Sequence, residues 1–396
     1  METITFLMTS TFYPPYHIGG DAVHVKLLAE ELVKRGHEVH VMHSLDAYRL
    51  KRKKLPEKKE DRQVHIHPLK SPFGKLDPVS VYTLGNSHYV TKKFSKIVKD
   101  VSPDVVHHHN ISLLGYQLFK KVGVYINLYT AHDYWLICQM NNLLKYGKEP
   151  CINKSCFLCS LRSKRPYQLW RNFNGFKESI SSLDCIITPS EYVKNSLSSE
   201  LGTVRITHIP NFIPSPPKDI ENSEYLNYFL YVGVLEKHKG IMNLLEVFKK
   251  YRGEIDARLI IAGKGSLERD IIKFINSNDS EEKIIYLGWC DRNKLYSLYK
   301  NALALIMPSI WPENCPLTAL EALSVGTPII SSNVGGLPEI VEKVNKNLVY
   351  NDDEELRTTI VNFKKEHYSS KAKEAYENFY MSQKFINEYF KLFRGD

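Results

Sequence analysis

The stretch PENCPLTALEAL, residues 312–323, places two glutamates eight positions apart around a predicted helix start. Pro316 suits the first turn of a helix, where its missing N–H costs nothing, and Gly326 suits the position just beyond the helix end. We therefore expect Glu313 to lie on a loop and Glu321 to lie about one turn inside the helix.

The start of this helix would carry a partial positive charge between the two carboxylates. The backbone N–H groups around Leu317, Thr318 and Ala319 lie in its first turn, where they lack acceptors within the helix. This layout suits a ligand with phosphates in the middle and hydroxyl groups at both ends, as in a nucleotide sugar. Acidic residues that only complement the helix dipole are the alternative.

Short apolar runs alternate with helix-period segments along the chain, which is typical of βα units around a parallel sheet. Examples are ITFLM, EVHVMH and VYINLYT in the first half, and YFLYVGV, RLIIA and PIIS in the second. Four prolines in residues 210–224 indicate a linker. We predict an α/β protein with two Rossmann-like, doubly wound parallel sheets that face an interdomain cleft. The predicted domains are residues 1–215 and 216–379. A last helix near residues 380–396 could pack against the first domain.

Composition narrows the class of protein. No run approaches the roughly 20 apolar residues that span a bilayer, and the opening residues alternate like a strand rather than a signal peptide. Seven cysteines, an odd number, do not resemble a secreted disulfide framework. We expect a cytoplasmic protein with reduced thiols.

The net charge of +9 is uneven, with +11 in residues 1–215 and −2 in residues 216–396. Much of the excess lies in RLKRKKLPEKKEDR, residues 49–62. This segment is either a solvated loop or a surface attracted to an anionic membrane, which would make the protein peripheral. Nucleic acid is not expected, because the run carries no interleaved aromatic residues.

Two further loops follow predicted strands, where open α/β sheets bind ligands. Gly19 and Gly20 leave the backbone bare near a helix start. His132 ends another strand, where it could donate or accept a hydrogen bond with Asp133 fixing its tautomer, although a structural histidine is the alternative. The three histidines at 107–109 point to alternate faces, so they cannot all serve one site.

Four cysteines gather in a polar, loop-like segment. Cys138, Cys151, Cys156 and Cys159 are separated by twelve, four and two residues. Four thiolates at such spacing could hold a structural zinc ion. Disulfides, or inert or redox-active thiols, are the alternatives.

The segment PENCPLTALEALSVGTPIISSNVGGLPEIV resembles the E-x7-E region of the family 4 retaining glycosyltransferases, which have the GT-B fold. Other motifs follow in the family's order, among them PPYHIGGDAVHVKLLAEELVKRGHEVHVM, AHDYW, TPSEYVK, IPNFI, YVGVLEKHKGI and IIAGKG. The similarity therefore covers most of the chain.

The resemblance implies roles for particular residues. His132 would contact the transferred sugar near the reacting carbon, Lys239 the diphosphate, and Glu313 the sugar hydroxyls; these three form the expected catalytic set. Glu321 would bind the nucleotide ribose. The expected donor-binding set is Gly19, Gly20, Gly233, Lys239, Gly263, Gly288, Asn314, Cys315, Pro316, Leu317, Thr318 and Glu321.

The implied reaction is transfer of a hexosyl unit, with retention, from a UDP- or GDP-sugar to a glycan or lipid-linked acceptor. No Asp-x-Asp motif is present, which is consistent with the metal-independent transfer that the resemblance implies, so no catalytic cofactor is expected. Val234 departs from the arginine found in many relatives, and Lys264 or His238 could replace that charge. A sugar-nucleotide epimerase and a non-catalytic nucleotide-sugar-binding protein are the alternative functions.

Overall fold

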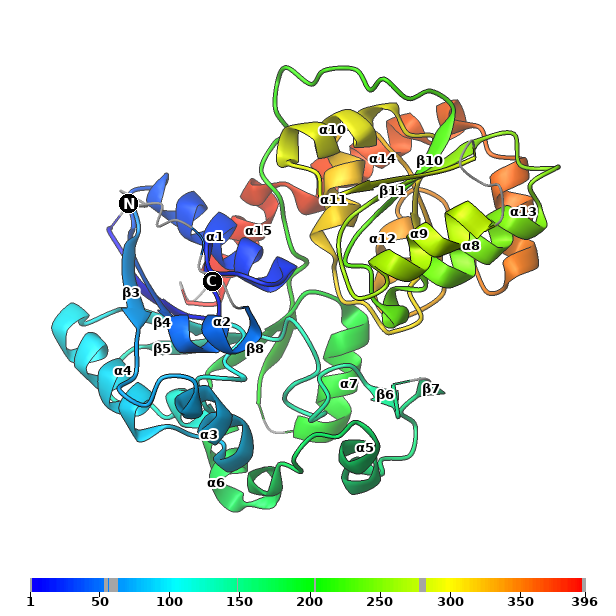
Figure 1. Ribbon diagram of the computed structural model, residues 1–396. Helices are drawn as coiled ribbons and strands as arrows, with labels where there is room; N and C mark the ends of the chain where they lie inside the picture. Colours follow the sequence, from blue (N-terminus) through cyan, green and yellow to red (C-terminus); the bar gives the residue numbers. More distant parts are fainter. Residues whose placement is uncertain are drawn as a thin grey trace. The chain divides into compact units, whose positions relative to one another are not determined.

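The chain divides into two compact α/β units in the computed structural model (Figure 1). The first unit comprises Met1–Ile209 together with Glu388–Asp396, and the second comprises Pro210–Asn387. Most of the basic segment at residues 49–62 lies outside the described residues. The structure describes residues 2–52, 56, 63–147, 149–202, 204–277 and 283–393.

A parallel sheet of seven strands forms the centre of the first unit, in the order β3-β2-β1-β4-β5-β8-β9. Its central strands β1, β4, β5 and β8 are almost entirely buried rather than alternating, as expected when helices cover both faces. The strands of this sheet are β1 (Thr5–Thr9), β2 (Glu38–Ser44), β3 (His65–Leu69), β4 (Val105–His108), β5 (Ile126–Thr130), β8 (Cys185–Thr188) and β9 (Ile206–His208).

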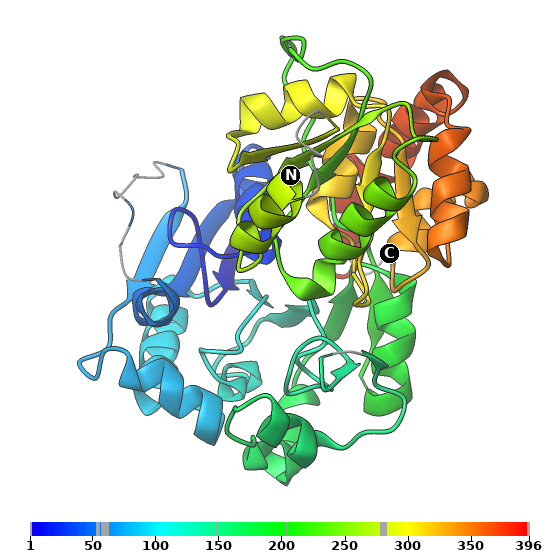
Figure 2. The ribbon, with the colours of Figure 1, turned by 45° about the vertical axis from the view of Figure 1, so that its right-hand side comes forward.

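Helices cover the two faces of the first sheet (Figures 1 and 2). Leu7 shares a buried cluster with Phe94 of α4 (His88–Val101), whereas its neighbour Phe6 stacks on Tyr389 of α15 (Ser382–Lys391). Adjacent residues of β1 therefore face opposite layers. The helices of this unit are α1 (Gly20–Val33), α2 (Leu45–Lys51), α3 (Leu76–Leu84), α4 (His88–Val101), α5 (Cys156–Arg162), α6 (Asn174–Ile180) and α7 (Glu191–Leu201), with η1 (Tyr116–Phe119) and η2 (Leu169–Asn172). A small antiparallel pair consists of β6 (Leu144–Lys145) and β7 (Glu149–Pro150).

The end of the chain belongs to the core of the first unit. Helix α15 (Ser382–Lys391) carries Tyr389, which is fully buried. The hydroxyl of Tyr389 lies 2.9 Å from Nδ1 of His107, and Nε2 of His107 lies 2.8 Å from Oγ1 of Thr130. The last turns of α15 therefore pack against β4 and β5, although Tyr389 and His107 are 282 positions apart in the sequence.

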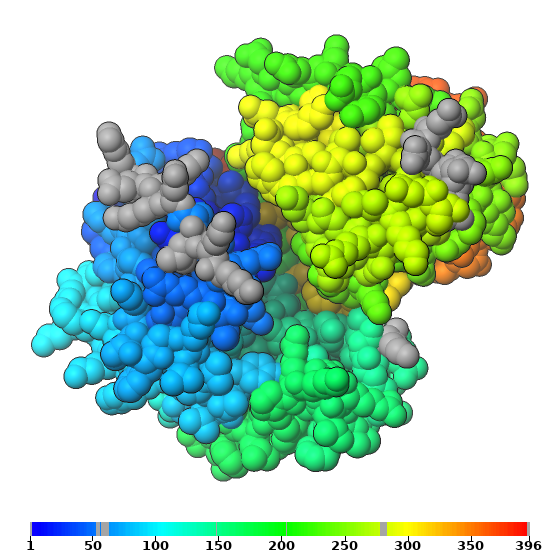
Figure 3. Space-filling view, viewed as in Figure 1, coloured from blue at the N-terminus to red at the C-terminus, as the bar shows by residue number. Residues whose placement is uncertain are grey.

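The second unit repeats this plan with a parallel sheet of six strands, in the order β12-β11-β10-β13-β14-β15. Its strands are β10 (Tyr228–Val232), β11 (Arg258–Ala262), β12 (Ile284–Gly288), β13 (Leu305–Met307), β14 (Ile329–Ser332) and β15 (Val349–Tyr350). Its α-helices are α8 (Ile241–Lys250), α9 (Glu268–Ser277), α10 (Arg292–Asn301), α11 (Leu317–Ser324), α12 (Leu337–Val341), α13 (Asp353–Val361) and α14 (Ser369–Ala375). Side chains of α8, α9 and α10 form the near face of this unit in the space-filling view (Figure 3).

Both sheets have the same switch point in strand order. The chain winds outward in one direction from β1 and from β10, and then in the other direction from β4 and from β13. The two predicted doubly wound sheets are thus confirmed. In such sheets the loops at the carboxyl ends of the two central strands diverge and leave room for a ligand.

Among the helices of the described residues, none combines the length and the apolar character that a bilayer crossing requires.

We predict that Tyr389→Phe lowers the free energy of unfolding by about 1 kcal/mol, because it removes one buried hydrogen bond and leaves a nitrogen of His107 without its partner. Thermal denaturation of the full chain measures the effect. Val124→Ala, at a fully exposed side chain of the first unit, is the control and should leave the transition unchanged. An unchanged transition in Tyr389→Phe would contradict the prediction.

Candidate functional site

The carboxyl ends of β10 and β13 carry the two residues expected to handle the charge of a phosphate ligand. The loop after β10 leads into η3 (Lys237–Lys239), and the loop after β13 leads through Glu313 to α11. Because β10 and β13 are neighbours at the switch point, the fold brings together Lys239 and Glu313, which are 74 positions apart in the sequence.

Lys239 and Glu313 form an ion pair in which Glu313 is buried and Lys239 is half-buried. The Lys239 Nζ atom lies 2.5 Å from Oε1 of Glu313, and the Ser309 hydroxyl donates to the same oxygen at 2.7 Å. The Glu313 side chain is 5% exposed. Burial by itself would raise the pKa of Glu313, but the Lys239 charge and the hydrogen bonds from Lys239 and Ser309 outweigh it and lower the pKa. Glu313 is therefore a carboxylate at neutral pH.

Two glycines let the backbone close around this ion pair. Gly240 has φ +71°, and a Cβ there would lie 1.7 Å from the carbonyl oxygen of Pro308. Gly335 has φ +66°, and a Cβ there would lie 2.4 Å from the carbonyl oxygen of Glu313. The N–H of Gly336 donates to that same oxygen at 2.7 Å. Any other residue at Gly240 or Gly335 would push one of the two functional loops away.

Helix α11 begins beside Glu313, one residue later than predicted. Pro316 is the N-cap, with Leu317 as the first helical residue, because Pro316 adopts an extended ψ of 131°. Gly326 lies beyond the helix end with φ +76°, as predicted. The Nδ2 atom of Asn211 donates to the carbonyl oxygen of Cys315 at 2.7 Å and so fixes the approach to the helix.

Glu321 lies inside α11, as predicted. Its Oε2 atom accepts a hydrogen bond from the Tyr299 hydroxyl at 3.1 Å. Burial raises the pKa of Glu321, while Tyr299 and Arg292 act in the opposite direction. Asn314 and Cys315 are buried in the loop, and Thr318 is half-buried in the first turn.

The predicted glycines of the second unit lie at the ends of adjacent strands. A Cβ on Gly263, which has φ +151°, would lie 1.9 Å from the carbonyl oxygen of Gly233. The N–H of Gly263 donates to the carbonyl oxygen of Gly288 at 2.7 Å. Val234 is 50% exposed, and Lys264 is also exposed. The bare backbone is therefore needed for strand-end packing, whether or not it also contacts a ligand.

In the first unit, the predicted glycines precede a half-buried acid. Gly20 is the first residue of α1, and Gly19 is its N-cap with extended backbone. Asp21 follows them and accepts a hydrogen bond from Nδ2 of Asn110 at 2.8 Å. Burial raises the pKa of Asp21, whereas the hydrogen bond from Asn110 lowers it. This contact joins the first turn of α1 to the loop after β4, at the switch point of the first sheet.

His132 lies after β5, as predicted, but its partner is not Asp133. The Nε2 atom of His132 lies 3.0 Å from Nδ1 of His109. The carboxylate of Asp133 instead accepts bonds from the N–H of Trp135 at 2.8 Å and from Nδ2 of Asn141 at 3.2 Å. The expectation that Asp133 fixes the tautomer of His132 was therefore wrong; His109 occupies that place, because the pairing of β4 with β5 carries it there.

The histidines around His132 are buried and neutral. Burial lowers the pKa of His132 to about 3 and that of His109 well below its usual value. The ring of His24 on α1 lies 5.2 Å from that of His132. His108 points to the opposite face, where its Nδ1 lies 2.7 Å from Oγ1 of Thr9. Sequence reasoning missed His24 and His109, although the histidine run gave a signal for the latter.

All seven cysteines of the chain are free thiols. Burial, followed by the neighbouring Cys138, Cys156 and Cys159, raises the pKa of Cys151, so the four cysteines of the predicted zinc segment interact electrostatically. Zinc binding by this segment stays a prediction.

Two family models together match nearly the whole chain. Residues 18–215 match Glycosyltransferase Family 4, and residues 216–379 match Glycosyl transferases group 1. An uncharacterized glycosyltransferase of Methanocaldococcus jannaschii is 27% identical over 364 residues, which cover 87% of this chain and 84% of that protein.

Solved glycosyltransferase structures share the fold. Sucrose-phosphate synthase from Thermosynechococcus elongatus matches with a TM-score of 0.73 at 16% identity, covering 100% of this chain and 99% of the other. The catalytic domain of starch synthase IV from Arabidopsis thaliana, bound to ADP and acarbose, matches with a TM-score of 0.69 at 13% identity, covering 99% of each chain. The fold is therefore GT-B.

We predict that Gly335→Ala lowers the melting temperature of the chain, because alanine at φ +66° costs about 1–2 kcal/mol and its Cβ meets the Glu313 backbone. Gly253→Ala is the matched control, since a Cβ at Gly253 meets nothing within 4 Å. Differential scanning calorimetry compares the variants. Equal melting temperatures for the two variants would count against the tight packing around Glu313.

Proposed function

Because the chain belongs to the group 1 glycosyltransferases, we propose that it moves a hexosyl unit from a UDP- or GDP-sugar to a hydroxyl of a glycan or lipid-linked acceptor, with retention of configuration. The observation that carries the proposal is the ion pair of half-buried Lys239 and buried Glu313 beside the start of α11. It combines a fixed carboxylate, a cation and a helix N-terminus, which are the groups that a sugar diphosphate needs.

Lys239 would stabilise the departing diphosphate. An ammonium group has three donors, and only one of them is needed for Glu313. The first turn of α11, with Leu317 and Thr318, adds the partial positive charge of a helix start. Stabilisation of developing charge is commonly the largest catalytic contribution, so these groups would supply it without a metal ion.

Glu313 would accept hydrogen bonds from hydroxyls of the donor sugar. The bonds from Lys239 and Ser309 both go to Oε1. The Trp311 side chain also interacts with this carboxylate and favours its charged form. A carboxylate can accept about four hydrogen bonds, so one position would remain for a substrate hydroxyl. The acceptor hydroxyl would attack from the face that the diphosphate leaves, and the departing phosphate would take its proton. No protein nucleophile is then needed.

Glu321 would bind the ribose of the nucleotide, with Tyr299 holding its carboxylate in place. The glycine-rich strand ends at Gly233, Gly263 and Gly288 would let the nucleotide approach the backbone. The starch synthase of the same fold, which was solved with ADP, supports a nucleoside diphosphate as the carrier.

His132 would contact the transferred sugar from the first unit. Burial holds it neutral, so one ring nitrogen can donate while the other accepts, and its bond to Nδ1 of His109 ties its tautomer to that of His109. Gly19 and Gly20 would border the diphosphate or the acceptor.

We expect a thermal-shift panel of UDP, GDP and ADP sugars to identify the donor, because a ligand that binds only the folded state raises its stability. With that donor, Glu313→Gln and Lys239→Ala should each reduce transfer by about 10²- to 10³-fold, the typical cost of losing one group that stabilises developing charge. Lys237→Ala, on the same short helix and exposed, is the control and should retain activity.

Other outcomes point to other functions. Conversion of the donor sugar without any acceptor would replace transfer with epimerisation. Binding of the donor with neither transfer nor hydrolysis would indicate a binding protein. Full activity in both Glu313→Gln and Lys239→Ala would overturn the proposed roles.

We further propose that the first unit attaches to an anionic membrane surface, where a lipid-linked acceptor would be found. Exposed apolar side chains lie on and just before α3, including Phe73 at 66%, Leu76 at 70% and Leu84 at 64%. Lys75 is the N-cap residue of the same helix. Apolar side chains next to a basic residue suit the lipid interface.

Flotation with vesicles that contain anionic lipid tests this attachment. We expect Leu76→Glu combined with Leu84→Glu to abolish it, because both changes place charge in the apolar layer. Val124→Glu, at a fully exposed side chain outside α3, is the control. Equal flotation of both variants, or none by the unmodified chain, would contradict the proposal.

A further inference from the structure

Three histidines and a glutamate gather at one edge of the first sheet. Glu38 and His40 lie two positions apart on β2, and His65 and His67 lie two positions apart on β3. Because side chains of a strand alternate between faces, each pair points to one side of the sheet. The parallel register places His40 directly beside His65, so the four side chains form one group, the edge histidine cluster.

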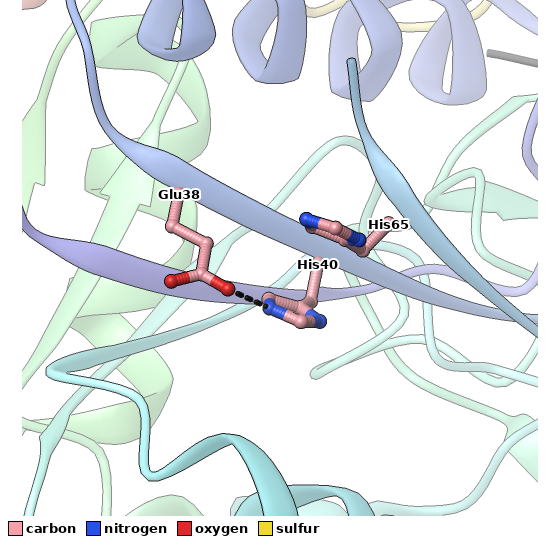
Figure 4. Close-up of side chains that lie close together, drawn as sticks. All are labelled: Glu38, His40 and His65. Carbon is pink, nitrogen blue, oxygen red and sulfur yellow. Dashed lines mark hydrogen bonds and ion pairs between the residues drawn. The ribbon is translucent and has the colours of Figure 1, made fainter. Parts of the chain in front are cut away.

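The ligand atoms of this cluster converge. Nε2 of His40 lies 3.0 Å from Oε1 of Glu38, and the ring of His65 stacks on that of His40 with 4.7 Å between centroids (Figure 4). One ligand atom each from Glu38, His40 and His65 all lie within 4.8 Å of one another. Donor atoms around a zinc ion lie about 2.0–2.2 Å from the metal, so small rotations of the exposed Glu38 and His65 side chains would complete a coordination set.

His67 supplies a supporting contact that bound metal sites commonly have. Its Nε2 atom lies 2.9 Å from Nδ1 of His40. If Nε2 of His40 bound a metal, its Nδ1 would carry the proton and donate it to His67, which fixes the orientation of the ring. His40 is 8% exposed, so the central ligand is held by packing while its partners remain accessible.

We propose that Glu38, His40 and His65 bind a divalent transition-metal ion of the zinc type, with His67 positioning His40. Two imidazoles and one carboxylate suit Zn²⁺, and also Cu²⁺ or Ni²⁺, better than Mg²⁺ or Ca²⁺. A fourth coordination position would be open to water, since Glu38 is 49% exposed in its side chain.

The cluster is separate from the candidate transfer site. Glu38 and His65 are the first residues of β2 and β3, so the cluster lies at the amino ends of these strands. His132 follows the carboxyl end of β5, which is three strands away from β2 in the same parallel sheet. The ion would join the edge strand β3 to β2 and stabilise this side of the sheet.

The test measures zinc binding by the full chain without a histidine tag, after removal of metal with a chelator. Zn²⁺ alone is titrated, and bound zinc is counted by mass spectrometry. We expect Glu38→Gln and His65→Ala each to bind one zinc ion fewer per chain than the unmodified protein, and His67→Ala to bind about 10- to 100-fold more weakly. The rise in melting temperature that Zn²⁺ causes should be lost in Glu38→Gln and His65→Ala, and reduced in His67→Ala.

Two controls separate this site from others. His88→Ala removes an exposed histidine of the first unit outside the cluster and should bind zinc as before. Cys156→Ser changes the predicted cysteine site. This variant should still bind the zinc ion that the edge histidine cluster holds. As a second readout, Cu²⁺ bound to the unmodified chain should show nitrogen hyperfine coupling by electron paramagnetic resonance, and His65→Ala should reduce it. Equal zinc content and affinity in Glu38→Gln, His65→Ala and the unmodified chain would overturn the proposal.

Discussion

The ion pair between Lys239 and Glu313 sets the requirements that the surrounding loops satisfy. A buried carboxylate left alone would be costly, and removing one member of such a pair typically costs about 3–5 kcal/mol. The two residues must therefore arrive together, which requires the ends of β10 and β13 to be neighbours. Gly240 and Gly335 then allow the backbone to close around the pair where a side chain would collide.

The two units share the same strand order around their switch points, but they place charged groups there in one unit and neutral histidines in the other. At its switch point the second unit places a lysine, two glutamates and a helix start, so it is suited to a charged ligand. Helix α1 and the loops of the first unit place histidines that burial keeps neutral, such as His24 and His109 around His132. Neutral rings suit sugar hydroxyls, which carry no charge.

The sequence predicts what depends on local patterns. Apolar runs and their spacing were enough for two parallel sheets, and the glycine and proline positions bounded α11 to within one residue. What escaped prediction depends on long-range pairing. His109 lies 23 positions from His132, and only the pairing of β4 with β5 brings the two rings together, whereas the adjacent Asp133 turns toward Trp135.

Close backbone approaches were equally hard to predict. Gly335 looks like any turn glycine in the sequence. Its importance appears only in the fold, where a Cβ at this position would collide with the carbonyl oxygen of Glu313, 22 positions earlier. The edge histidine cluster has the same origin. Its residues alternate with apolar ones on two strands, a pattern that is typical of any half-exposed strand. Only the register of β2 against β3 brings these side chains together.

The return of the chain through Tyr389 into the first unit has a consequence for evolution and engineering. A hybrid enzyme made by joining the front half of one relative to the back half of another would inherit a mismatched tail, since that tail fills a space shaped by Phe6 and His107. Successful recombination should therefore exchange residues 210–387 as an internal cassette, and leave both ends of the polypeptide from the same parent.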